Sequence, residues 1–499
     1  MDKLKELVEV LTLNKLKSIE IIDQNMDRDS MLMKLYNGIR NEEFKTDDTA
    51  WIKLYPNAKN KNAYYKLKHT LKERLFNSLF FIDVKSNKLS DIHSAKIYLQ
   101  KLTSLINILR SKGSKKNAID MAKKGLKIAE NYEFYEERLV FLKTLRSYYS
   151  LMEGDDTNFQ YYRQQAEECS QLITSETTIE GILQELMLLY ANDKSTKAHI
   201  HKHILNQLEF LQQFTPQRPS IKWIFHYSMI EVAGFLSKND YKGGLDCSEK
   251  ALAKIKSFSF VHTSSIISIS IQAVSCCLQL NQYKKGEELL KNGIDIMQPG
   301  IFNWFKYHEM YVMLCFHSGQ YAKGYKIYLK STKHSNFKNL PKNALEVWRI
   351  YEAWMYFLSK ASIIAENSEI RKFRTLRYLN ELPIYSKDKS GLNISIIVSK
   401  IAIFLIDKKF DKIIDEKEAI NRYKDRYIDK EYNLRSKLFI NLLLKIPSAN
   451  FQRKLIKEKA KKEIKMLNNL PIEKANQSAD IEIFPYENLW KILLNKMNP

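Results

Sequence analysis

The chain has 499 residues, of which 44% are hydrophobic and 12% aromatic, so it can bury a continuous core and is not a disordered protein. Its 14 glycines and 10 prolines are too few for an all-β fold with many turns, and long apolar-periodic segments rich in Leu, Lys and Glu predict a mostly helical protein. The formal net charge of +23 favours contact with nucleic acid, an anionic lipid surface or an acidic protein.

The positive charge is concentrated in two zones. Residues 51–125 carry 17 basic and 4 acidic side chains, and residues 371–470 carry 25 and 12. Residues 126–370 carry 27 and 26 and are nearly neutral. Two basic zones therefore flank a neutral middle. The alternative explanation is compositional, because the chain is also rich in Asn and Ile, as expected from an AT-rich genome that favours Lys codons.

The cysteines and the N-terminal residues indicate the compartment. Five cysteines without a Cys-x-x-Cys pair fit free thiols in a reducing environment better than a disulfide framework. Residues 1–7 are charged and contain no signal-peptide core, and no apolar run reaches the roughly 18 residues of a membrane span. We therefore expect a cytoplasmic protein without a membrane span.

Residues 1–89 are predicted to form an N-terminal helical domain. Thr46 is a good N-cap for a short helix that stops at Pro56, and a longer helix with a basic face starts at Ala63. Together they make a candidate helix-turn-helix at 46–81. This segment loosely resembles the winged-helix segment of some bacterial activators that place a DNA-binding domain before helical repeats. The alternative is a helical cap on the repeats with a solvated lysine face.

One pattern recurs further along the chain: a short polar stretch, an aromatic residue, a tiny residue three positions later and another small residue seven beyond that. Both spacings are helical, so the small residues share one face, where a neighbouring helix can approach closely. The polar stretch suits a tight turn between antiparallel helices. Three clear copies contain Tyr241, Gly244 and Ala251; Tyr283, Gly286 and Gly293; and Tyr321, Gly324 and Ser331, and a further copy contains Ala118 and Gly125.

This pattern resembles the tetratricopeptide repeat, a helix pair of this kind that stacks on its neighbours. The best copies are residues 112–130, 239–258, 281–298 and 319–334, at spacings longer than the usual 34 residues. The resemblance implies a superhelix of helix pairs over residues 90–381. Such a superhelix has an extended concave surface, which generally binds peptides or other proteins.

Residues 382–499 are predicted to form a basic helical C-terminal region that begins with a linker at 382–390. Residues 451–467 form an amphipathic helix with two expected sides: inward Leu455, Ala460, Ile464 and Met466, and outward Arg453, Lys454, Lys457, Lys461 and Lys465. Residues 484–497 are expected to pack as a cap, because their apolar side chains need cover. The predicted fold class is therefore all-α, a tetratricopeptide-like α-solenoid between an N-terminal helical domain and a basic helical C-terminal region.

No set of residues favours catalysis, since the chain has no phosphate-binding glycine loop, nucleophile elbow or kinase-like set. His199 and His203 lie one helical turn apart and would suit Zn²⁺ or Cu²⁺, but no third ligand is near, and solvated or capping histidines are the alternative. The adjacent Cys276 and Cys277 lie in an apolar stretch, where burial is the alternative to redox chemistry. We predict a protein that is not an enzyme and holds no cofactor or metal.

The leading functional interpretation is a non-enzymatic intracellular scaffold or adaptor that binds a partner protein or peptide on the concave face of the repeats. The alternatives are a nucleic-acid-binding transcriptional regulator with its contacts at 46–81, and a helical accessory subunit of a nucleic-acid-associated effector complex. Aromatic residues interleave with basic ones within residues 46–81 and again at 371–378, which suits base stacking and phosphate contacts. The alternative is that these basic side chains snorkel at the edge of a helical core. The predicted nucleic-acid contacts are Lys59, Lys61, Lys66, Lys68, Lys72, Arg74, Arg371, Lys372, Arg374, Lys454, Lys457 and Lys461.

Overall fold

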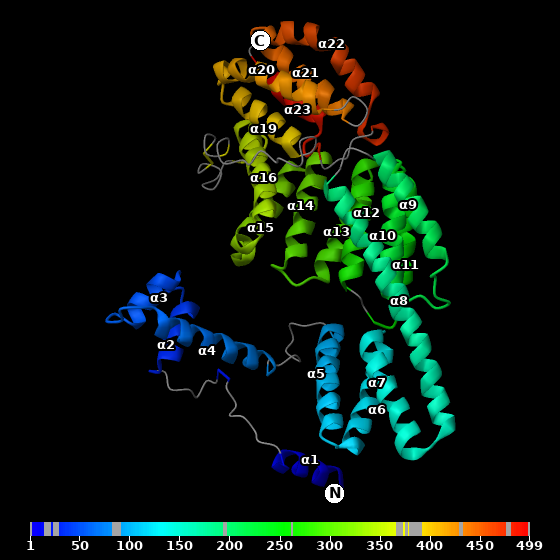
Figure 1. Ribbon diagram of the computed structural model, residues 1–499. Helices are drawn as coiled ribbons and strands as arrows, with labels where there is room; N and C mark the ends of the chain where they lie inside the picture. Colours follow the sequence, from blue (N-terminus) through cyan, green and yellow to red (C-terminus); the bar gives the residue numbers. More distant parts are fainter. Residues whose placement is uncertain are drawn as a thin grey trace. The chain divides into compact units, whose positions relative to one another are not determined.

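The computed structural model describes residues 2–13, 21–22, 29–81, 91–192, 197–260, 263–365, 373–374, 378, 392–428, 433–475 and 481–497. Over these residues the protein is all-α and has no strand (Figure 1). None of the helices in this part of the chain is both long and apolar enough to cross a membrane.

The contacts divide the chain into two compact units, Met1–Ser170 and Gln171–Pro499, called here the N-terminal and C-terminal units. The division falls within one long helix, α8 (Asp156–Asn192). It differs from the predicted boundaries after residues 89 and 381, and the three-part organisation stays a prediction.

The N-terminal unit contains two apolar cores. One lies between α2, α3 and α4 and includes Leu35, Ala50 and Leu71, and the other lies between α5, α6 and α7. Thr46 caps α3 as predicted, because its hydroxyl accepts from the backbone N–H of Thr49. The helices are α1 (Asp2–Leu13), α2 (Met31–Arg40), α3 (Asp47–Leu54), α4 (Asn62–Leu79), α5 (Asp91–Ser111), α6 (Lys115–Asn131), α7 (Tyr135–Tyr148), the π-helical turn η1 (Tyr149–Glu153) and the first part of α8.

The C-terminal unit consists of successive helices that pack on their neighbours in sequence, from α9 through α15 and again from α19 through α22 (Figure 1). Short turns make consecutive helices antiparallel, so they form adjacent helix pairs. The helices are α9 (Lys197–Gln212), α10 (Ile221–Ser237), α11 (Tyr241–Lys256), α12 (Thr263–Gln279), α13 (Tyr283–Asp295), α14 (Phe302–His317), α15 (Tyr321–Thr332), η2 (Ser335–Asn339), α16 (Lys342–Lys360), α19 (Leu392–Ile406), α20 (Phe410–Tyr427), α21 (Leu434–Ser448), α22 (Arg453–Asn469), η3 (Ile472–Lys474) and α23 (Tyr486–Asn495).

The turn within these helix pairs has one recurring backbone conformation. Asn239, Asn281 and Gly319 have φ of 60°, 57° and 71°, and the N–H of the residue after each donates to the carbonyl five residues earlier, at 2.8 to 3.0 Å. This arrangement satisfies carbonyls that the helix end leaves without a partner. The same turn also occurs at Gly113, Glu133 and Lys408, so it extends to places where the sequence pattern is weak or absent.

The small residues of the pattern lie where helices approach closely. A Cβ on Gly286 would stand 2.6 Å from Leu314 Cδ1, and one on Gly324 would stand 3.1 Å from Cys315 Cβ. Similar approaches occur at Gly125, Gly244 and Gly293, and the other small residues, Ala118, Ala251 and Ser331, are buried. These residues therefore pack helix against helix and do not gather at one site.

The aromatic residues of the pattern lie beside the turns. Tyr241 and Tyr283 donate from their hydroxyls to the side chains of Asn239 and Asn281, at 3.2 and 2.6 Å. The third copy has Gly319 in place of the asparagine. There the ring of Tyr321 stacks on Phe484, with centroids 5.4 Å apart and planes at 13°. In this copy, a ring contact with a residue far along the chain takes the place of the hydrogen bond to asparagine.

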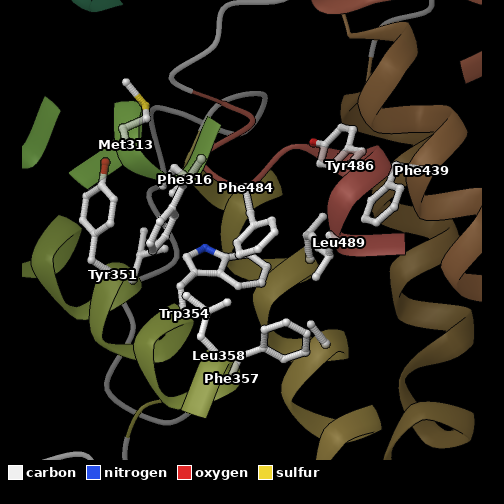
Figure 2. Packing of buried hydrophobic residues seen from close by; sticks show 14 of the residues in the cluster. Met313, Phe316, Tyr351, Trp354, Phe357, Leu358, Phe439, Phe484, Tyr486 and Leu489 are labelled. Atoms are coloured by element: carbon white, nitrogen blue, oxygen red, sulfur yellow. The ribbon is translucent and has the colours of Figure 1, made fainter. Parts of the chain in front are cut away.

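Phe484 is the centre of an aromatic cluster in the largest core of the C-terminal unit. The centroid of its ring lies 5.4 Å from that of Phe316, 5.2 Å from that of Trp354 and 6.3 Å from that of Phe357. Figure 2 shows these side chains packed together. Further on, Trp490 and Leu493 are buried in the same core. Residues 481–497 therefore cover apolar side chains of α14 and α16, as expected of a cap.

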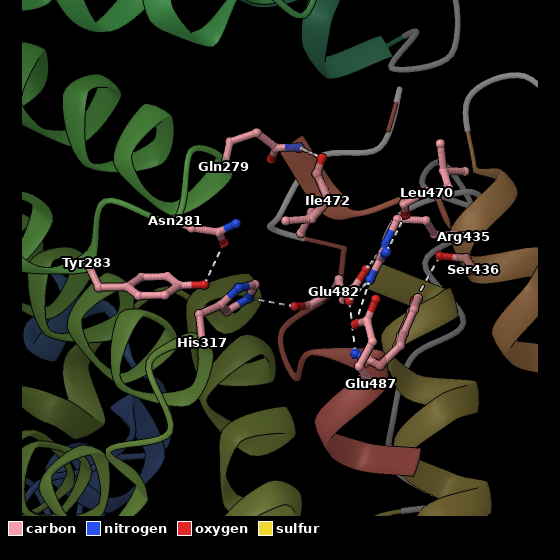
Figure 3. A network of polar contacts seen from close by, with 11 residues as sticks. Gln279, Asn281, Tyr283, His317, Arg435, Ser436, Leu470, Ile472, Glu482 and Glu487 are labelled. Atoms are coloured by element: carbon pink, nitrogen blue, oxygen red, sulfur yellow. Dashed lines mark hydrogen bonds and ion pairs between the residues drawn. The ribbon is translucent and has the colours of Figure 1, made fainter. Parts of the chain in front are cut away.

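A polar network fixes the same segment (Figure 3). Arg435 on α21 is 1% exposed and donates to both carboxylate oxygens of Glu482, from Nε at 2.9 Å and from Nη2 at 2.7 Å. The carbonyl of Glu482 lies 2.8 Å from His317 Nε2 at the end of α14. Gln279 at the end of α12 donates to the carbonyl of Ile472 at 2.6 Å. Ile472 and Glu482 are therefore tied to the ends of α12 and α14, respectively.

The buried face of α22 differs from the predicted one. Ile456 and Leu467 are buried together with Ala460, whereas Leu455 and Met466 are 38% and 42% exposed. The prediction was therefore wrong for Leu455 and Met466, because the neighbouring residues Ile456 and Leu467 are the ones that pack inward. Arg453 was expected to point outward, but it is partly buried, and its guanidinium donates to the side chain of Asn495 at 3.0 Å.

Candidate ligand-binding cleft

One wall of a cleft in the C-terminal unit comes from α10. This helix is largely apolar, and Glu231 is its only acidic residue. Trp223, Tyr227 and Glu231 recur at intervals of four residues, so they lie one above another on the same face. The Trp223 and Tyr227 rings stack with centroids 4.8 Å apart and planes at 13°. Because Trp223 is 5% exposed, the core holds this stack in place.

The other wall comes from α11, which runs antiparallel to α10. The thiol of Cys247 donates to Glu231 Oε2 at 3.6 Å, and a Cβ on Gly243 would stand 2.5 Å from the ring of Phe235. In an antiparallel pair, each step forward on one helix corresponds to a step back on the other. The same register therefore places Lys254 and Lys250 further along the cleft, toward the N-terminal end of α10.

The two walls enclose a cleft of about 640 Å³. This volume lies within the roughly 300–1,000 Å³ of typical ligand pockets. One end is formed by Phe235, Gly243 and Asp246, and the other by Thr215, Pro219 and Lys254. Since α10 and α11 are joined by the recurring turn, the helix-pair geometry itself fixes the spacing of the walls.

The charged groups of the cleft are ordered along its length. Glu231 faces Cys247; along α11, Asp246 comes just before Cys247, and Lys250 and Lys254 follow it by about one and two helical turns. Burial raises the pKa of Glu231, while the thiol of Cys247 and the charge of Lys250 act in the opposite direction. No ion pair to Glu231 occurs among the residues that the structure describes.

The thiol in the cleft is a hydrogen-bond donor. Burial first, and then the Glu231 carboxylate, raise the pKa of Cys247 to about 12. At neutral pH the thiol therefore keeps its proton and donates it to Glu231, and it is a poor nucleophile. Burial also raises the pKa of Tyr227, again with a contribution from Glu231. The cleft is thus suited to holding a group by charge, stacking and hydrogen bonds.

The sequence pattern does not predict this cleft. Of the predicted repeat-packing residues, Ala251 lies in its lining, and the others lie between helices. The available signal was a single carboxylate in an apolar helix, preceded at four-residue steps by Tyr227 and Trp223.

The structure places several predicted nucleic-acid contacts of the N-terminal unit in ion pairs. Lys68 lies 2.6 Å from Asp47, and Lys61 pairs with Asp48. Both aspartates are in the first turn of α3, where they also stabilise the helix N-terminus. Lys59, Lys66 and Lys72 are exposed, and Arg74 is partly buried. The basic face of α4 is therefore partly neutralised by the chain itself.

The basic face of α22 is more open. Lys454, Lys457 and Lys461 are exposed at helical spacing, and Lys465 continues the same stripe. These four lysines form no ion pair with any residue that the structure describes. Of the other predicted contacts, Arg374 is exposed, and Arg371 and Lys372 lie outside the described residues.

The histidine and cysteine motifs show no metal or redox arrangement in the described part of the chain. His203 Nε2 lies 3.5 Å from Glu185, and the side chain of His199 lies outside the described residues. Across those residues no three metal-ligating side chains come together. Cys276 and Cys277 are fully buried, and burial raises their pKa to about 12 and about 11. They pack as core side chains, next to Gly244 and Gly286.

Comparison with known proteins yields no match: no protein-family model fits the chain, no curated protein is significantly similar to it, and no solved structure significantly matches it. Its function is therefore inferred from its own residues.

Proposed function

We propose that the protein is a non-enzymatic adaptor that binds a peptide segment of a partner protein, on a tetratricopeptide-like array of helix pairs. The observation that supports this function is the cleft between α10 and α11. Its aromatic wall is fixed in the core, while its charged groups line an open space. Repeat arrays of helix pairs commonly bind partners on the surfaces that such pairs create.

The dimensions of the cleft suit an extended peptide. From Trp223 to Phe235 the wall of α10 rises about 18 Å, at 1.5 Å per residue. An extended chain covers that length with about five or six residues, at roughly 3.3 Å each. A volume of about 640 Å³ admits side chains of such a segment but not a folded domain.

The test is a peptide-display selection against the full chain, followed by blocking of the cleft. Lys250→Cys introduces an exposed thiol in the cleft, and a bulky maleimide attached there fills the space. The label is selective, because Cys169, Cys276, Cys277 and Cys315 are buried and the pKa of Cys247 is raised to about 12. Lys284→Cys on α13, labelled in the same way, is the matched control, since it is exposed and outside the cleft.

We expect selected peptides to lose at least about tenfold in affinity, or about 1.4 kcal/mol, for the labelled Lys250→Cys protein and to keep their affinity for the labelled Lys284→Cys protein. Selection without any enriched peptide, or equal binding to both labelled proteins, would contradict the proposal.

The stripe of Lys454, Lys457, Lys461 and Lys465 on α22 favours a second candidate function, nucleic-acid binding. Its unpaired charges would contact phosphates, and each contact to a single strand contributes about 0.7 to the slope of log K against log salt. Replacing all four lysines by Gln should lower that slope by about three, measured by anisotropy with a labelled single-stranded RNA of random sequence. The matched control replaces four exposed lysines of the neutral middle of the chain, Lys242, Lys284, Lys326 and Lys333. Absence of binding by the unmodified chain at low salt would exclude this candidate.

A further inference from the structure

Unlike Glu287 and Glu309, the partly buried Glu231 forms no direct ion pair with a residue that the structure describes, although Lys250 acts on it electrostatically. Glu287 lies 2.7 Å from Lys291 and 2.5 Å from Lys323, and Glu309 lies 2.7 Å from Lys306. Glu231 receives only the hydrogen bond from the neutral thiol of Cys247 and forms no ion pair with the described residues. Partial burial of a carboxylate that has no direct ion pair carries a free-energy cost in the folded protein.

The aromatic wall places a second feature beside this carboxylate. The ring of Tyr227 has Trp223 stacked on one face, and Glu231 follows one helical turn further on. Tyr227 and Glu231 are close enough that the carboxylate affects the phenol electrostatically. An aromatic ring next to a carboxylate attracts a cation twice, through the ring quadrupole and through direct charge–charge attraction.

From this geometry we infer that the Glu231 end of the cleft is a subsite for a basic side chain, Lys or Arg, of the bound peptide. This inference rests on the proposed function and specifies the chemistry of its ligand. The cationic head binds between the Glu231 carboxylate and the Tyr227 ring. Asp246, which precedes Cys247 on α11 and also lines the cleft, adds a second negative charge near this subsite.

Lys250 acts as a competitor for this subsite. It lines the cleft about one helical turn beyond Cys247 and acts electrostatically on Glu231. It is nevertheless exposed and forms no ion pair with that carboxylate. A solvated lysine of this kind screens the subsite without filling it. Removing its charge should therefore strengthen binding of a cation, whereas a substitution that merely damaged the fold would weaken binding.

The charge order along the cleft also predicts a spacing in the peptide. Glu231 and Ile224 are seven residues apart on α10, which corresponds to about 10 Å along the helix, and the register places Lys254 opposite Ile224. An extended peptide spans that distance in about three residues. A basic residue at the subsite therefore fits best with an acidic residue about three positions away, near Lys254.

The experiment uses the full chain labelled with 5-fluorotryptophan, so that the six tryptophans report by ¹⁹F NMR. The resonance of Trp223 is assigned with Trp223→Phe. The probes are N-acetyl-arginine amide and N-acetyl-citrulline amide, which have nearly the same shape and differ in charge. We expect the arginine probe to shift the Trp223 resonance at about tenfold lower concentration than the citrulline probe.

Three variants separate the subsite from general effects. Glu231→Gln keeps the side-chain volume and should make the two probes equivalent, and Lys250→Gln should tighten binding of the arginine probe about two- to fivefold with no change for citrulline. Glu288→Gln removes an exposed carboxylate on α13 outside the cleft and should change neither. Equal response to both probes in the unmodified chain would overturn the inference. Peptides that nevertheless bind in the cleft by the labelling test would leave the adaptor function standing.

Discussion

Two glutamates of the C-terminal unit differ in burial and in surroundings: Glu482 is fully buried, and Glu231 is partly buried in the wall of the cleft. Glu482 is 1% exposed and accepts two hydrogen bonds from the Arg435 guanidinium and one from the backbone N–H of Tyr486. Glu231 accepts one bond from the neutral thiol of Cys247. Burial raises the pKa of both carboxyls, but only at Glu482 does a guanidinium act against that rise.

The comparison distinguishes the surroundings of Glu482, where the chain pairs its own buried charges, from the cleft between α10 and α11, where the carboxylate has no direct ion pair. Ile472 and Glu482 supply backbone carbonyls to the ends of α12 and α14, Glu482 is also the partner of the buried Arg435, and Phe484 supplies an aromatic ring beside Trp354 of α16. Between α10 and α11, the charged wall has no such cover among the described residues. A paired buried carboxylate is part of the folded structure, whereas an unpaired one has a free-energy cost that a ligand can relieve.

The largest expected effect is at the buried Arg435–Glu482 pair. Arg435→Met leaves Glu482 buried without its countercharge, so we expect the free energy of unfolding of the C-terminal unit to fall by about 3–5 kcal/mol. The measurement is urea unfolding of the full chain followed by circular dichroism. Arg422→Met, at an exposed position on α20, is the control and should change stability by less than about 0.5 kcal/mol. Equal effects would show that the Arg435–Glu482 pair does not hold this region.

An intermediate effect comes from pH. Burial lowers the pKa of His317 and His308 to about 4, from an ordinary value of 6.5. The unfolded chain therefore binds protons first, so stability is complete above about pH 6.5 and falls as the pH drops toward 4. Each histidine contributes up to about 1.4 kcal/mol per pH unit. His317→Gln should flatten the dependence of Tm on pH over this range, while substitution of the exposed His69 on α4 should leave it unchanged.

The smallest effect is expected at the cleft and has the opposite sign to the first. Because the folded-state pKa of Glu231 is raised, the ionised carboxylate destabilises the native state above that pKa, and the cost disappears as the pH falls through it. Glu231→Gln should therefore leave Tm at neutral pH unchanged or raise stability by up to about 1 kcal/mol. Glu482→Gln, the same substitution at the buried Arg435–Glu482 pair, should lower the stability. A clear loss of stability in Glu231→Gln would remove the contrast between the two regions.

The features that sequence alone predicts are local ones. Gly244, Gly286 and Gly324 were identified from spacing within a few residues, and the structure places each in a close contact between helices. The N-cap at Thr46 was found for the same reason, because a cap bonds to residues only three positions away.

The features that sequence did not predict depend on contacts between distant segments. Gln279 and Ile472 are 193 residues apart, and Arg435 and Glu482 are 47 apart, so no helical period relates them. Net charge also misled in part, since counting lysines does not reveal that Asp47 pairs with Lys68. The cleft was missed because the stacked Trp223 on its wall is buried as deeply as a core residue, and a sequence pattern gives both the same signal.

The bond between His317 and the carbonyl of Glu482 joins residues 165 positions apart, which has a consequence during synthesis. Ribosomes add about 5–20 residues per second, so α14 leaves the ribosome on the order of ten seconds before the segment that covers its end. During that interval the rings of Phe316 and Trp354 lack the contact with Phe484. Nascent chains halted between α16 and residue 470 should therefore expose this aromatic edge to chaperones, and translation through the last helices becomes the step that ends that exposure.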